Sequence, residues 1–212
     1  MPVFESSDVR SLSLFKGGLV LLALSASAAL GCASSPPPAA PAPQKAATAA
    51  DYFPLDLGWK WAYELNREGQ HMLAVYSVLE RVAEGAVVQA GDQRISYAVN
   101  QEGIAIIDAT GRDFIIKNPV VRGATWDVFA GTATIAAVDK KVSLPSGDYA
   151  NCVVVETLRH DPTRLSRTTF APGVGPVSVE VQVETQGRFV TTMHADLRGT
   201  TKPGQDPLAS SN

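Results

Sequence analysis

A strict alternation of apolar and polar residues near the carboxyl end of the chain constrains the fold most. Valines occupy every second position from 177 to 183, with serine, glutamate and glutamine between them. The same period of two returns over residues 189–197, after a break at Gln186-Gly187. Successive side chains of a strand point to opposite faces of a sheet, so each segment has one buried face and one solvated face. The two segments are predicted to form a β-hairpin.

The rest of the chain after residue 50 carries further strand patterns. Trp59, Trp61 and Tyr63 alternate with mostly polar residues. Three other runs are apolar at consecutive positions and are predicted to lie centrally, covered on both faces: 72–79, 103–109 and 152–156. Glycine, proline, asparagine and aspartate separate the runs at intervals of roughly 8 to 14 residues. The pattern predicts an all-β domain of about ten antiparallel strands.

Strand length favours one curved sheet over two stacked ones. The segments around Tyr76, Val155 and Val181 run close to ten residues, whereas the commonest strands have about five or six. Long antiparallel strands coil, so we expect a single, strongly curved antiparallel sheet or an incomplete barrel. A β-sandwich is the alternative. The concave face of a curved sheet is either filled by side chains or left as a cavity.

A short apolar run precedes the predicted domain. Residues 17–30 follow Arg10 and Lys16 and carry no charge, but they are fewer than the roughly 20 residues that a membrane-spanning helix needs. A basic flank, a short apolar core and small residues behind it are typical of an export signal that is removed. We therefore predict a signal peptide over residues 1–31.

The end of this run, Ala29-Leu30-Gly31-Cys32, resembles the bacterial lipobox, although Leu30 lies one place closer to the cysteine than usual. The resemblance implies that Cys32 carries a covalent diacylglycerol and an N-acyl chain, which hold the protein on a membrane. An ordinary secretory signal with an incidental Cys32 is one alternative, and a Cys32–Cys152 disulfide is another. With Cys32 acylated, Cys152 is expected to be a small buried hydrophobe. No other cofactor is expected.

Residues 32–50 are almost entirely alanine, proline and serine. Such a segment cannot bury enough apolar surface to fold, so we predict a disordered tether. It leads into a β domain over residues 51–200, and a flexible tail follows over 201–212. Ala33 after the cysteine, in place of aspartate, resembles lipoproteins that pass to the outer membrane. The formal net charge of −3 gives no basic surface for nucleic acid, so no nucleic-acid partner is expected.

Three stretches, YFPLDLGWKWAYEL, SLPSGDYANCVVVE and FAPGVGPVSVEV, resemble a broad set of exported bacterial lipoproteins without an assigned activity. At the level of fold, this set is similar to the curved-sheet domains of lipoprotein carriers. The set supplies no catalytic residues, and a similarity of fold alone says little about function. Tyr149 and Thr169 depart from the commoner residues of the pattern. Pro172 and Gly173 also have a structural reason, since they suit the two central positions of a type II turn.

The residues offer little support for catalysis. His71, His160 and His194 share no spacing typical of metal ligands, and there is no G-x-S-x-G nucleophile motif. His160-Asp161-Pro162 is interpreted as a turn between two strands. We therefore predict a protein that is not an enzyme and has no metal site, with a hydrolase that uses His160 as a remote alternative.

Two groups of residues are candidates for binding. Trp59, Trp61 and Tyr63 are candidates for contacting an apolar ligand, although filling the core is the ordinary role of such side chains. A second group forms a basic spot that could contact anionic lipid head groups or polysaccharide, or simply be a solvated hairpin end: Arg159, Arg164 and Arg167.

The predicted function is that of a lipid-anchored, non-catalytic lipoprotein of the bacterial envelope. Its β domain would bind a lipid or another apolar ligand, or handle lipoproteins, on its concave face. The alternative is a module with a solid core that binds another envelope protein.

Overall fold

The computed structural model describes residues 47–109 and 111–204. The predicted signal peptide, Cys32 and most of the predicted tether lie outside the described residues, as does most of the predicted tail. Helix α1 begins at Ala49, inside the range predicted for the tether, and the last strand ends at Thr201. None of the helical structure within the described ranges is long and apolar enough to cross a bilayer.

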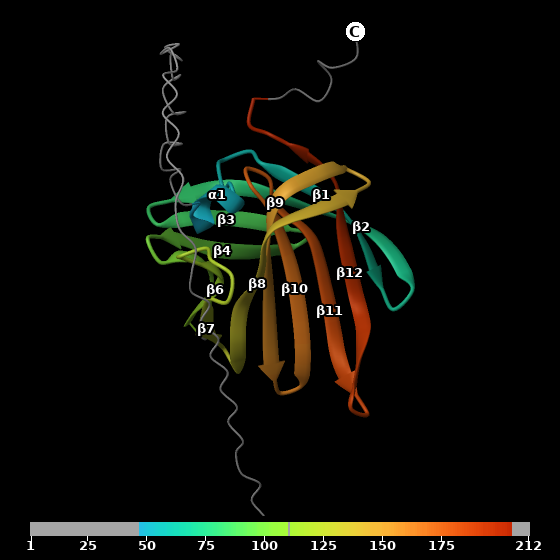
Figure 1. The fold of residues 1–212 in the computed structure, drawn as a ribbon. Coiled ribbons are helices and arrows are strands. Elements are labelled where there is room, and N and C mark those ends of the chain that lie inside the picture. Colours follow the sequence, from blue (N-terminus) through green and yellow to red (C-terminus); the bar gives the residue numbers. More distant parts are fainter. Residues whose placement is uncertain (1–46, 110, 205–212) are drawn as a thin grey trace, which may run out of the picture. The chain divides into compact units, whose positions relative to one another are not determined.

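A one-turn helix precedes twelve strands. The elements are α1 (Ala49–Tyr52), β1 (Lys60–Arg67), β2 (Gln70–Val82), β3 (Gly85–Ala90), β4 (Gln93–Asn100), β5 (Gly103–Asp108), β6 (Gly111–Lys117), β7 (Thr125–Val128), β8 (Gly131–Leu144), β9 (Gly147–His160), β10 (Thr163–Ala171), β11 (Gly175–Thr185) and β12 (Arg188–Thr201). All strands belong to one antiparallel sheet in the order β6-β5-β4-β3-β2-β1-β12-β11-β10-β9-β8-β7 (Figure 1). The prediction of a single curved sheet is confirmed, and the sandwich alternative is wrong.

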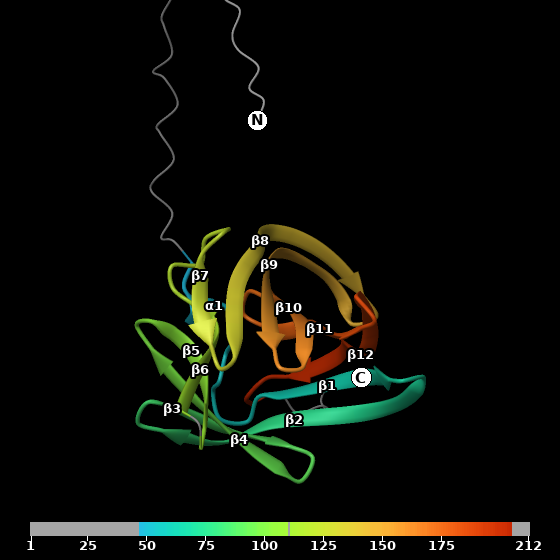
Figure 2. The same cartoon turned by 90° about the horizontal axis from the view of Figure 1, so that it is seen from below.

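The sheet curves until its two edge strands, β6 and β7, contact each other (Figure 2). Within the described residues these strands lie at opposite ends of the hydrogen-bonded order, so side chains close the gap. The indole Nε1 of Trp126 on β7 donates to the carbonyl oxygen of Phe114 on β6 at 2.9 Å. Asp113 on β6 accepts from the backbone N–H of Phe129 at 2.7 Å and from Arg159 of β9 at 2.7 Å. The domain is thus an incomplete barrel with a side-chain seam.

The predicted hairpin near the carboxyl end is confirmed. Strands β11 and β12 pair antiparallel, with Val179 opposite Ala195 and Val181 opposite Met193. The turn at Gln186-Gly187 has positive φ at both residues, which matches the right-handed twist of the strands that it joins.

The three runs predicted to be covered on both faces differ in the structure. Cys152 to Val155 on β9 are all buried, as predicted. The run 103–109 is buried only in its first part, since Ile104 is buried and Ile107 is exposed. The prediction for 72–79 is wrong, because Leu73 is 69% exposed. The physical reason is that a single curved sheet has no second layer to cover the outer face of β2.

The segment around α1 closes one end of the barrel. Asp51 accepts hydrogen bonds from the backbone N–H and the hydroxyl of Thr48, which stabilises the short helix at its start. The backbone carbonyl of Asp51 in turn accepts from the N–H of Gly173 at 2.7 Å. Val174 N–H donates to the carbonyl of Ala171 at 3.2 Å, and Gly173 has a φ of 66°, so the predicted type II turn is present. Two of the stretches behind the family resemblance therefore meet here.

Candidate functional site: the cavity inside the curved sheet

The inner face of the barrel encloses a cavity of about 260 Å³. Its walls come from β1 to β6, from β10 to β12, and from the segment after α1. They are lined by Phe53, Trp61, Tyr63, Leu65, Tyr76, Val88, Ile95, Tyr97, Ile106, Ile115, Thr168, Phe170, Pro176, Val179, Met193 and Ala195. Apart from hydroxyl groups, the indole of Trp61 and the thioether of Met193, these side chains are hydrocarbon. Such a lining suits an apolar ligand.

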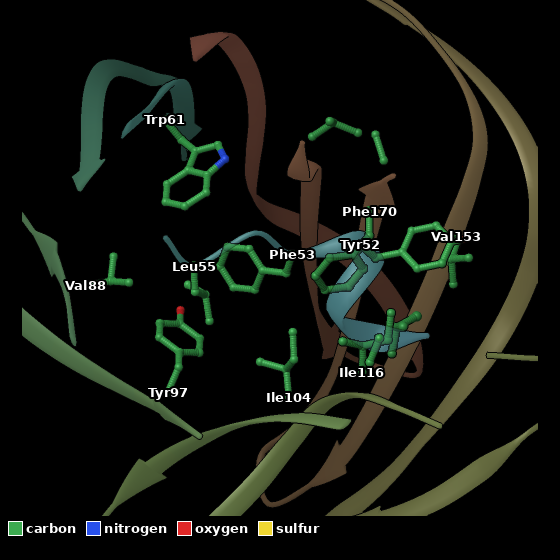
Figure 3. Close-up of a cluster of buried hydrophobic side chains, with 14 of the residues drawn as sticks. Tyr52, Phe53, Leu55, Trp61, Val88, Tyr97, Ile104, Ile116, Val153 and Phe170 are labelled. Carbon is green, nitrogen blue, oxygen red and sulfur yellow. The ribbon is translucent and has the colours of Figure 1, made fainter. Parts of the chain in front are cut away.

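An aromatic cluster forms the closed end of the cavity. The ring of Phe53 lies 5.5 Å from Trp61 and 5.3 Å from Tyr97, edge to face in both pairs, as Figure 3 shows. Phe170 lies 6.4 Å from Phe53 on the other side. Edge-to-face pairs contribute about 0.5–1.5 kcal/mol each beyond the burial of their area. Gly175 fits against this cluster because a Cβ there would lie 3.0 Å from the Trp61 Nε1 and 3.2 Å from Phe53.

Two of the lining aromatic side chains are fixed by hydrogen bonds to the turn before β11 and to its first residues. Trp61 donates from Nε1 to the carbonyl of Val174 at 2.6 Å, and the hydroxyl of Tyr63 donates to the carbonyl of Pro176 at 2.7 Å. Burial raises the pKa of Tyr63 well above its ordinary value, so the phenol stays a neutral donor. These bonds satisfy the polar atoms of the two rings, which present their apolar surfaces to the cavity.

Tyr97 is different because its hydroxyl has no hydrogen-bond partner among the described residues, although the residue is only 8% exposed. Among the described residues, Asp196 Oδ1 is the only side-chain oxygen or nitrogen that is fully enclosed and has no hydrogen-bond partner. The Tyr97 oxygen is therefore not fully enclosed. It borders open space, and Tyr97 is one of the residues that line the cavity. Burial raises the pKa of Tyr97, which keeps its phenol protonated. A hydroxyl group at the wall of a cavity can orient a bound molecule.

The three aromatic residues that the sequence singles out differ in their relation to the cavity. Trp61 and Tyr63 line the cavity. Trp59 is buried and stacks on Trp61 with the ring centroids 5.6 Å apart, but it is not part of the lining. Trp59 therefore contacts a lining residue without lining the cavity itself.

The three candidate arginines differ in their charge partners. Arg159 pairs with Asp113 at the seam at 2.7 Å, and Arg167 pairs with Glu156 at 2.7 Å and with Glu180 at 3.7 Å. Arg164 is exposed and has no ion pair or hydrogen bond within the described part of the chain. The three side chains do not form one basic spot, because carboxylates neutralise two of them.

Most of the lining was not identified from the sequence. Ile95 and Tyr97 alternate with Arg94 and Ser96 on β4, and this short period-two pattern could have placed both on the inner face. Phe53 carried no such signal, since it precedes the first strand. It reaches the cavity because α1 turns the chain across the end of the barrel.

The remaining polar clusters do not suggest a metal centre. Across residues 47–109 and 111–204, no three His, Cys, Asp or Glu side chains are placed to hold a metal ion. His71 lies 3.3 Å from Glu64, and His194 lies 3.0 Å from Asp196, in separate pairs. His160 is exposed at the end of β9, beside the turn that the sequence predicts. Cys152 is a buried free thiol.

Comparison with known proteins gives two structural similarities. A candidate exported protein with a YmcC-like fold from Bacteroides fragilis matches with a TM-score of 0.47 and 12% identity, covering 71% of this chain and 99% of its own. A candidate lipoprotein from Parabacteroides distasonis matches with a TM-score of 0.42 and 14% identity, covering 71% and 98%. No family model and no curated protein matches the sequence. Similarity this distant carries no argument about function.

Proposed function

We propose that the domain is a non-catalytic binding protein that holds a lipid or another apolar ligand in the cavity of its curved sheet. The single observation that carries this proposal is the hydrocarbon-lined cavity of about 260 Å³. A core that only stabilised the fold would be close-packed, because empty apolar volume forfeits contacts. The hydroxyl group of Tyr97 at its wall would offer a ligand a polar contact.

The proposed place of action is the bacterial envelope, with the outer membrane as the specific compartment. The support is the apolar run over 17–30 and the lipobox-like end at Cys32, which would anchor the domain by covalent acyl chains. The alanine- and proline-rich segment after Cys32 would act as the tether. Intact mass spectrometry of the protein from its own membranes tests this part: a mass equal to a chain starting at Cys32 plus acyl chains is expected, and an unacylated chain would contradict it.

Binding is tested with the neutral fluorophore N-phenylnaphthylamine, displaced by decanol. Ala195 lines the cavity and its methyl group can be extended into it. Ala195→Leu is expected to weaken binding about tenfold or more, because the larger side chain occupies cavity volume that the fluorophore needs, and a misfit of this kind costs about 1–3 kcal/mol.

Ala62→Leu is the matched control. Ala62 lies between Trp61 and Tyr63 on β1 and therefore points to the opposite, outer face. The affinity of the Ala62→Leu variant for the fluorophore should stay within about twofold of that of the unmodified protein. A domain that binds no fluorophore, or that loses binding equally in both variants, would refute the proposal.

A second candidate function is contact with another envelope protein through the outer face of β2. Leu73 and Val75 lie exposed on that face, opposite Glu64 and Ala62 of β1. Exposed apolar side chains that gather on one surface often mark contact sites. The cavity favours ligand binding over this candidate, since a module with a solid core has no use for it.

A further inference from the structure

The cavity opens away from the aromatic cluster at its closed end. Trp61, Val88 and Phe170 are almost completely buried, whereas Leu65, Ile106 and Met193 on the same walls are only half-buried. Beyond Leu65, Ile106 and Met193, each strand continues to a turn on the side away from the aromatic cluster. The mouth therefore lies at that end, and the side chains beyond the lining determine what meets a ligand there.

Strand register places Arg164 at this mouth. Thr168 of β10 lines the cavity, and alternation puts Ser166 and then Arg164 on the same inner face. Four residues at about 3.3 Å each place the Cα of Arg164 about 13 Å from that of Thr168. Arg164 therefore lies beyond the lining toward the mouth, where its side chain can meet the head of a chain that projects from the cavity.

The positive charge of Arg164 is unbalanced. Its partners in register are Val183 on β11 and Arg159 on β9. Like charges directly opposite each other in a sheet are unfavourable. Asp113 and the carbonyl of Phe129 engage Arg159, at 2.7 and 2.6 Å. In the described ranges, no carboxylate pairs with Arg164, because Asp113 pairs with Arg159.

We propose that the ligand of this cavity is an amphiphile whose anionic head, a carboxylate or phosphate, pairs with Arg164 at the mouth. This inference rests on the proposed function, because the hydrocarbon chain of the amphiphile occupies the cavity. The planar guanidinium group matches the geometry of both anions. The cavity lies slightly below the roughly 300–1,000 Å³ typical of sites for drug-sized ligands, which suits a single unbranched chain.

Displacement of N-phenylnaphthylamine by decanoic acid, decyl phosphate and decanol at neutral pH tests the inference. The three share one ten-carbon chain and differ only in the head group. We expect at least one of the two anions to bind about fivefold more tightly than decanol, the strength of a partly exposed ion pair. High salt should reduce this preference. The preferred anion identifies the head group.

Arg164→Gln should remove the preference for the anion and leave decanol binding unchanged. Arg94→Gln is the matched control, since Arg94 is an exposed arginine on β4 that alternates outward from Ile95. Equal displacement by all three compounds would overturn the inference and leave the proposed function intact. An equal loss in both variants would also overturn it, as a general effect of charge. Displacement by none of them would refute the proposed function itself.

Discussion

Tyr63 and Tyr97 have similar surroundings but different hydrogen bonding. Both rings line the cavity and both residues are buried. Tyr63 donates to the carbonyl of Pro176 at 2.7 Å, whereas Tyr97 has no partner within the described residues. Removing the hydroxyl group from each tyrosine in turn therefore measures how much one buried hydrogen bond contributes to the free energy of unfolding.

Tyr63→Phe should lower the free energy of unfolding by about 1–2 kcal/mol, because it leaves the carbonyl of Pro176 without its donor. Tyr97→Phe should change this free energy by less than about 0.5 kcal/mol, because no bond is lost. Urea denaturation of the two variants measures both values. Equal destabilisation would mean that the Tyr97 hydroxyl has a partner, and would weaken its assignment as a ligand-facing donor.

At the scale of elements, side-chain hydrogen bonds hold the seam between β6 and β7, which are not neighbours in the hydrogen-bonded strand order. Asp113 joins β6 to the β7–β8 turn and to β9 through Phe129 and Arg159. Asp113→Ala should lower the free energy of unfolding by about 1–2 kcal/mol, since it removes an acceptor shared by two donors. The amides of β7 should also exchange faster with solvent.

Asp127→Ala is the control for the seam, because Asp127 is an exposed carboxylate on β7 itself. The free energy of unfolding of the Asp127→Ala variant should differ from that of the unmodified protein by less than about 0.5 kcal/mol. Hydrogen exchange and urea denaturation give both readouts. A loss in Asp127→Ala as large as that in Asp113→Ala would show that the seam depends on net charge and not on the Asp113 bridge.

The elements could largely be predicted from the sequence where local patterns determine them. The alternation along 177–197 predicted the β11–β12 hairpin, and Pro172-Gly173 predicted the type II turn; the structure has both. Strand β7 was missed because four residues are too short to establish a period. The exposure of β2 was also missed, because an apolar run does not indicate whether a second layer covers it.

For the whole molecule, the sequence predicted a curved sheet with a concave face but could not decide between a cavity and a filled core. That choice depends on where Phe53 and Phe170 meet, and they are more than a hundred residues apart in the chain. Neither helical nor strand periodicity reports such a contact. For the same reason, the free Arg164 could not be told from the paired Arg159 and Arg167.

The most direct test of ligand binding inside the sheet is a methyl-labelled NMR titration with decanol. Binding in the cavity should shift the methyl signals of the lining residues Ile95, Ile106 and Ile115, with saturation at one decanol molecule per domain. The methyl groups of Leu73 and Val75, exposed on the outer face of β2, should not move. Shifts confined to Leu73 and Val75, or no shifts at all, would contradict the account.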